Sequence, residues 1–125
     1  MGKSEIEKVT LSEKFSLIND HWNPRVAGEL NGQQVKLAKF LGPFEWHHHA
    51  NEDEFFMVMK GQIEIHLRDK VVTLRPGEFL IVPRGVEHRP VANEEAEVLM
   101  FEPASTINTG NLENSDRTRT RLSKI

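Results

Sequence analysis

The residues best suited to chemistry lie in one short segment, residues 46–54 (WHHHANEDE). It contains three histidines and three carboxylates, which are nitrogen and oxygen ligands for metal ions. If residues 44–49 form a strand, His47 and His49 project from one face and His48 from the other. Two imidazoles would then converge on one point, whereas His48 would be structural or exposed.

A carboxylate completes the candidate site. The next predicted strand begins near Glu54, so a tight connection would place this side chain beside the histidine pair. Two imidazoles and one carboxylate suit a first-row divalent cation. Glu52 or Asp53 would replace Glu54 as the ligand if the register shifted by one or two residues, and otherwise both are solvated loop charges.

A fourth candidate ligand follows a second segment, residues 77–88 (GEFLIVPRGVEH). A strand runs into a Pro/Gly turn, and His88 stands at the start of the next strand. The chain has no cysteine, so a metal would depend on nitrogen and oxygen ligands. It also has no tyrosine, which leaves acid and base roles to other side chains or to metal-bound water.

The elements that must position these side chains are mostly strands. From Arg25 onward, short β-rich runs alternate with turn residues. Asn31-Gly32 predicts a tight hairpin, and Asn93 is expected to divide the last two runs. This cadence indicates an all-β sandwich or barrel. One short helix is expected near the start, where Thr10 and Glu13 form a possible capping box. A chain of 125 residues suits one domain.

Composition excludes several classes of partner. A formal net charge of −3 argues against binding to nucleic acid, which needs a basic face. No apolar run is long enough to span a bilayer, and the polar start lacks the apolar stretch of a signal peptide. We therefore expect no membrane partner and a cytoplasmic location.

Two spacings carry a family resemblance. The first segment resembles the first cupin motif, H-x-H-x4-E-x6-G, and the second resembles G-x5-P-x-G-x2-H. The matching positions are His47, His49, Glu54, Gly61, Gly77, Pro83, Gly85 and His88. The chain departs from the family pattern at Gly42, one residue nearer the histidines than usual, and at Ala92, where the family has asparagine. Both departures affect loop geometry and leave the four ligand positions intact.

The resemblance implies a jelly-roll-like β-barrel, the double-stranded β-helix, over residues 25–103. An N-terminal segment (1–24) would precede it and a polar, solvated C-terminal tail (104–125) would follow. The resemblance further implies one divalent metal ion per chain held by His47, His49, Glu54 and His88. The ligand set does not distinguish iron, manganese, nickel, zinc and copper.

Several functions fit this metal-binding barrel. One is a dioxygenase-like enzyme for a small molecule, another is an isomerase or epimerase of a sugar or keto acid, and a third is a non-catalytic ligand-binding or sensor module. No general acid or base can be assigned from the sequence, and His21, His48 and His66 receive no role. We expect a mostly apolar pocket lined by Phe56, Val58, Ile63, Ile65, Ile81 and part of 98–101. Strands that are apolar on both faces also predict a homodimer.

Overall fold

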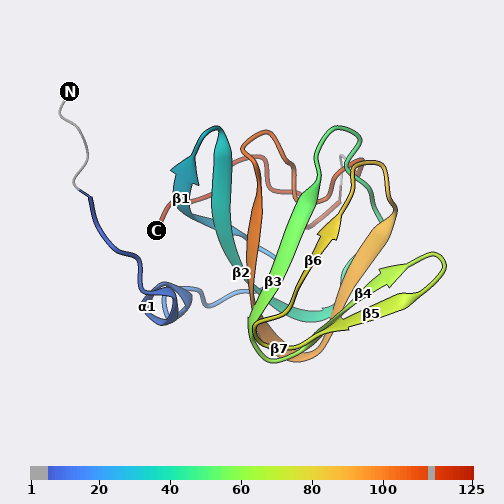
Figure 1. Cartoon of the computed structure of the whole chain (residues 1–125), viewed down its shortest axis with the longest axis horizontal. Coiled ribbons are helices and arrows are strands. Elements are labelled where there is room, and N and C mark those ends of the chain that lie inside the picture. The colour runs from blue at the N-terminus through green and yellow to red at the C-terminus, as the bar shows by residue number, and fades with distance from the viewer. Residues whose placement is uncertain (1–5, 113–114) are drawn as a thin grey trace.

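The computed structural model describes residues 6–112 and 115–125, and it confirms the predicted all-β fold (Figure 1). One short helix, α1 (Leu11–Phe15), precedes seven strands: β1 (Arg25–Leu30), β2 (Gln33–Pro43), β3 (Glu54–Lys60), β4 (Ile63–Leu67), β5 (Val71–Leu74), β6 (Phe79–Val82) and β7 (His88–Pro103). Among these described residues, no helix is long and apolar enough to cross a membrane.

The long strand β7 joins the two layers of the molecule. Its first residues pair with β4, from Leu67 opposite His88 to Glu64 opposite Val91, and β4 pairs in turn with β5. Its second part lies between β2 and β3, and β1 and β6 extend that layer outward. One strand therefore serves both layers, and its first residue, His88, is held opposite Leu67 of β4.

The predicted hairpin between β1 and β2 is present. Asn31 and Gly32 have positive φ values of 51° and 77°, as a two-residue turn between antiparallel strands requires. Farther along β2 the register shifts between Phe40 and Gly42. Gly42 then pairs with Ala92 of β7, so the two positions that depart from the family pattern are opposite each other.

Three details of the expected elements were wrong. Residues 44–49 are not a regular strand, because their one ladder partner is the isolated bridge between His47 and His88. Asn93 does not divide two strands, since β7 continues through it as an exposed stretch. Helix α1 forms where it was expected, but Thr10 caps it without a side-chain hydrogen bond.

The hydrophobic core consists of two clusters on opposite faces of the β2–β7–β3 layer. The inner cluster fills the space between the layers and includes Phe40, Phe56, Ile65 and Val98. In the outer cluster, Phe15 and the following Ile18 pack on Leu37. The N-terminal segment therefore covers part of the outer face and leaves the interior to the functional site.

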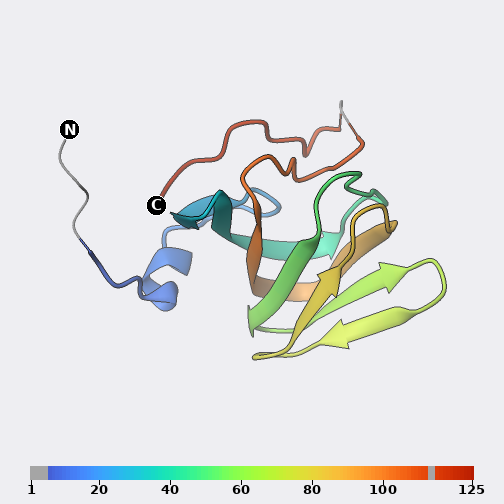
Figure 2. The same ribbon diagram turned by 45° about the horizontal axis from the view of Figure 1, so that its top comes forward.

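The segment that follows β7 does not extend into solvent. It runs across one end of the two layers and returns to β1 (Figure 2), where Lys124 and Val26 form a parallel bridge. Thr109 is completely buried, and its hydroxyl oxygen lies 2.8 Å from the carbonyl oxygen of Leu112, to which it donates. The expectation of a solvated tail was wrong, because the polar side chains of this segment satisfy its own backbone.

Candidate metal centre

Backbone hydrogen bonds fix three of the four candidate ligands. The His47 N–H donates to the His88 carbonyl at 3.0 Å, and the His88 N–H donates to the His47 carbonyl at 2.9 Å. The backbone carbonyl of the third histidine, His49, accepts from the Gly85 N–H at 2.7 Å. These bonds attach the irregular segment 44–49 to the turn before β7, so histidines far apart in the chain share one site.

The imidazole orientations of His47 and His88 are set in the same way. Nδ1 of His47 lies 2.8 Å from the Glu45 carbonyl oxygen, and Nδ1 of His88 lies 2.9 Å from that of Val86. A carbonyl oxygen only accepts, so each Nδ1 carries the proton. In the neutral form of each ring, Nε2 then offers the lone pair that a metal ligand requires.

Glu54, the first residue of β3, lies among the three imidazoles. Its Oε1 is 3.1 Å from Nε2 of His88 and 3.2 Å from Nε2 of His49. One ligand atom from each of His47, His49, Glu54 and His88 can be chosen such that all lie within 4.8 Å of one another, and all four residues are buried. The structure thus brings together every predicted ligand, in an arrangement compatible with metal binding.

The electrostatics of the cluster favour a neutral His47 and an ionised Glu54. Burial, followed by the charge of His88, lowers the pKa of His47 to about 4. Burial alone would raise the pKa of Glu54, but the close approach of His49 and His88 outweighs it and holds this pKa well below its usual range. Neutral nitrogens and an ionised carboxylate are the forms that bind a cation.

The alternative carboxylates lie outside the cluster. Asp53 accepts from the Arg84 backbone N–H at 2.9 Å, and Glu52 accepts from the Ser105 hydroxyl at 2.9 Å. Both are loop residues with protein partners of their own, and neither belongs to the ligand group.

The histidines without a predicted role also have other partners. His21 pairs with Glu95 at 2.7 Å, and His66 contacts Glu64 at 2.9 Å on β4. His48 is half-buried, and its backbone N–H donates to the side-chain oxygen of Asn111. None of the three is a member of the ligand cluster.

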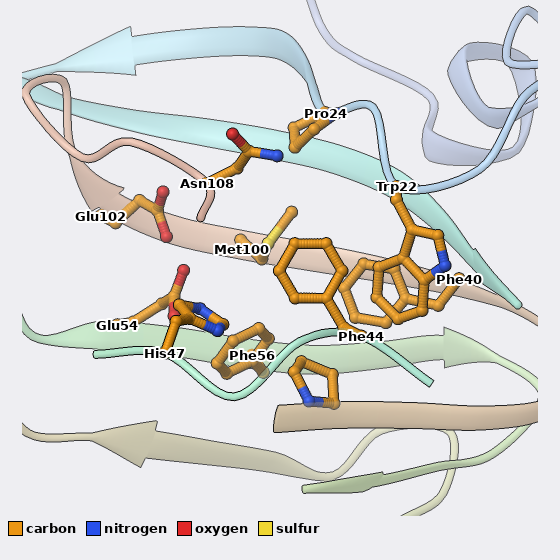
Figure 3. Close-up of a pocket in the computed structure, with 11 residues that line it drawn as sticks. Trp22, Pro24, Phe40, Phe44, His47, Glu54, Phe56, Met100, Glu102 and Asn108 are labelled. Atoms are coloured by element: carbon orange, nitrogen blue, oxygen red, sulfur yellow. The ribbon is translucent and has the colours of Figure 1, made fainter. Parts of the chain in front are cut away.

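A pocket of about 380 Å³, its open mouth included, adjoins the cluster (Figure 3). His47, Glu54 and Glu102 form one end, while aromatic rings gather at the other. The lining is mostly apolar, as expected, and consists of Trp22, Pro24, Phe40, Phe44, His47, Glu54, Phe56, Pro90, Met100, Glu102 and Asn108.

The predicted pocket lining was only partly right. Phe56 and Met100, from the predicted range 98–101, are present. Val58, Ile63 and Ile65 are completely buried or nearly so and lie in the inner core, outside the pocket lining. Ile81 is 53% exposed on the outer face of β6, which is the opposite side of the layer.

A buried pair at the polar end, Lys36 and Glu102, was not predicted from the sequence. Their side chains are both 2% exposed, and Nζ lies 2.7 Å from Oε2. Burial and the neighbouring Glu54 raise the pKa of Glu102 well above its usual range, and Lys36 offsets this only in part. Strand alternation could have indicated that both side chains point inward. Lys36 lies on the same strand face as Phe40, and Glu102 lies on the same face as Met100.

Comparisons with known proteins agree with this geometry. The family model described as "Cupin domain" matches residues 41–102, which include all four candidate ligands. The solved structure of a cupin-2 domain containing protein from Shewanella frigidimarina NCIMB 400 is similar at 48% identity and a TM-score of 0.75. That similarity covers 76% of this chain and 93% of the Shewanella chain.

Two further relatives are similar over different lengths. A structure from Neisseria meningitidis is 28% identical with a TM-score of 0.72, and the match covers 78% of this chain and 100% of that one. The Bacillus subtilis (strain 168) protein YdbB, described as uncharacterized, is 40% identical over 62 residues. That match spans 49% of this chain and 55% of YdbB, so little more than half of YdbB has a counterpart here.

Proposed function

The chain belongs to the cupin family, and we propose on that premise that it holds one divalent metal ion between His47, His49, Glu54 and His88. The observation that carries this proposal is the buried cluster of four ligand atoms within 4.8 Å. Three imidazole nitrogens and one carboxylate suit first-row divalent metals.

The state of His49 supports the fit. Its side chain is 2% exposed, its Nδ1 has no hydrogen-bond partner among the described residues, and its Nε2 faces another candidate ligand, the Glu54 carboxylate, at 3.2 Å. Buried polar atoms without partners are costly, and each one in a native structure needs an explanation. A metal ion bound at one ring nitrogen of His49 supplies it.

A bound metal would provide Lewis-acid or redox chemistry beside the pocket. The protein's own groups orient the ligands and shape the site. The Glu45 and Val86 carbonyls fix the histidine tautomers, and the rings of Phe44 and Phe56 exclude water from the polar end.

The pocket lining favours one reaction class. Hydroxyl-rich sugars need several polar groups for binding, whereas this lining is dominated by Trp22, Phe40, Phe44, Phe56 and Met100. We therefore infer a dioxygenase-like enzyme that acts on a small, mostly apolar substrate, in preference to a sugar isomerase. The metal-loaded protein should consume oxygen with such a substrate, and a ligand-binding or sensor module would consume none.

Elemental analysis tests the metal proposal directly. Untagged protein purified without chelator is compared with His49→Ala and His88→Ala, and His48→Ala is the matched control from the same segment. We expect near-stoichiometric metal in the parent and in His48→Ala, and a small fraction of it in the two ligand variants. A parent that stays metal-free after incubation with divalent ions would refute the proposal.

A second copy of the chain is the proposed protein partner. Helix α1 covers only part of the outer sheet face, and Phe79 and Ile81 of β6 remain 56% and 53% exposed. Phe55 stacks on Phe79 with ring centroids 4.9 Å apart, so the exposed apolar surface is continuous. Pairing of two such surfaces would remove it from water.

A further inference from the structure

Two glutamates stand beside each other on the interior face of the sheet. The β3–β7 register pairs Phe55 with Phe101, which puts Glu54 and Glu102 side by side at the next position. Both are buried, and Figure 3 shows their carboxyl groups directed at each other at the polar end of the pocket. Like charges on directly opposite residues destabilise a sheet, and burial removes the water that would weaken their repulsion. This pair therefore needs compensation from its surroundings.

Lys36 of β2 supplies one part of that compensation. It lies opposite Met100 on the other side of β7, which places it diagonally beside Glu102. Its Nζ is 2.7 Å from Oε2 of Glu102 and 3.3 Å from the Thr106 carbonyl oxygen. Lys36 thus holds the Glu102 carboxyl group by one oxygen, and it brings a single positive charge to two carboxyl groups.

A proton supplies the other part. The Glu102 and Glu54 carboxyl groups are hydrogen-bonded to each other, and carboxylates only accept, so one of the two is un-ionised. Oε1 of Glu54 lies 3.2 Å from Nε2 of His49 and 3.1 Å from Nε2 of His88, which favours an ionised Glu54. Glu102 is then the donor. This agrees with the raised pKa of Glu102 and with its buried Oε1, to which no N–H of the described residues donates.

We propose that Glu102 is a positioning residue for Glu54: it is held by Lys36, donates a hydrogen bond to the Glu54 carboxylate, and fixes the orientation in which that carboxylate meets the three imidazoles. Carboxylates that bind metals are commonly held by such a second residue. Glu102 itself lies outside the group of four ligands. This inference rests on the proposed function, because it takes Glu54 as a metal ligand.

Three variants separate a positioning role from a merely structural one. In Glu102→Gln the amide oxygen can accept from Lys36 and the NH2 group can donate to Glu54, as the un-ionised carboxyl group does. Glu102→Met keeps a similar length but has no donor. Leu37→Ala is the control for lost stability, because Leu37 is completely buried on the same strand as Lys36 but belongs to the outer cluster.

The full chains are titrated with Co²⁺, whose visible absorption depends on the number and arrangement of its ligands. Urea unfolding of metal-free samples records their stability. We expect Glu102→Gln to match the parent in affinity, spectrum and stability. Glu102→Met should bind Co²⁺ about tenfold or more weakly and with a changed spectrum. Leu37→Ala should lose stability but keep the affinity and spectrum of the parent.

The outcomes also distinguish this inference from the proposed function. If Glu102→Met does not fold, Lys36→Met/Glu102→Leu, which removes both members of the buried pair, replaces it. A donor-free variant that binds Co²⁺ as the parent does would overturn the role of Glu102 alone. If Glu102→Gln lost as much affinity as the donor-free variant, Glu102 would act through a negative charge, and the inference would be wrong. A parent that binds no Co²⁺ overturns the proposed function itself.

Discussion

Gly110 of the C-terminal segment is packed directly against the backbone of His48. A β-carbon built on Gly110 would overlap the His48 carbonyl oxygen, and it would lie 3.1 Å from Cδ2 of His47. The Asn111 N–H donates to the same His48 carbonyl at 3.0 Å. The C-terminal segment therefore supports the loop that carries two of the candidate metal ligands.

Gly110→Ala is expected to destabilise the protein and to weaken metal binding. The added methyl group meets backbone, which cannot move aside as a side chain would, so the cost is about 1–3 kcal/mol beyond that of the positive φ. Gly32→Ala is the matched control, because Gly32 also has a positive φ but has no atom near its missing β-carbon. Urea unfolding and metal titration of both variants check this, and equal losses in the two would contradict it.

The buried pair of Lys36 and Glu102 predicts that substitutions of the two residues have strongly non-additive effects on the free energy of unfolding. Lys36→Met leaves the Glu102 carboxyl without its partner in the interior and should lower the free energy of unfolding by about 3–5 kcal/mol. Lys36→Met/Glu102→Leu removes both groups and should cost much less than Lys36→Met alone. Chemical denaturation of metal-free samples measures the cycle. Additive losses would show that the pair is not energetically coupled.

The lowered pKa of His47 predicts that the stability of the metal-free protein depends on pH. Its pKa is lowered from 6.5 to about 4, so between these values the unfolded chain binds a proton that the folded chain does not. The free energy of unfolding should therefore decrease as the pH falls from 6.5 to 4, by about 3 kcal/mol from this group.

The variant His47→Gln isolates that contribution. The comparison is needed because Glu102, whose pKa is raised, contributes with the opposite sign and loses its contribution as the pH rises. The free energy of unfolding is measured in urea with chelator present, from pH 4 to pH 7. It should decrease less steeply towards low pH in His47→Gln than in the parent. Identical slopes in the two proteins would contradict the lowered pKa.

The local parts of the site could be predicted from the sequence. Alternation along an extended segment puts His47 and His49 on one side, and their burial agrees although the segment is not a regular strand. The turn at Asn31-Gly32 follows from residues that tolerate positive φ. These features depend on neighbours in the chain, which a sequence pattern records.

The features that the sequence did not predict depend on contacts between residues that are far apart in the chain. Lys36 and Glu102 lie 66 positions apart and meet only because β2 and β7 are paired. Lysine and glutamate are rarely buried, so composition suggests solvent for both. The C-terminal segment was misjudged for a similar reason. Its polarity suggests a solvated tail, whereas Thr109 and Asn108 use their polar groups to bind its own backbone.

The exposed apolar surface of β6 predicts how the proposed homodimer responds to mutation. Ile81 projects from the outer face at the edge of the layer, directly opposite Phe55 in the β3–β6 register. Ile81→Asp would place a charge in the proposed interface, and in a two-fold dimer the change occurs twice. Each copy should weaken association by about 2 kcal/mol, the cost typical of a central interface residue.

Sedimentation at micromolar concentration measures this effect. We expect a dimer for the parent and a monomer for Ile81→Asp, with unchanged unfolding of the monomer because the side chain is already half in solvent. Val71→Asp is the control, since Val71 is 52% exposed but lies on β5 in the other layer, and that variant should remain dimeric. A parent that sediments only as a monomer would refute the dimer. Dissociation of Val71→Asp instead of Ile81→Asp would move the interface to the β4–β5 side.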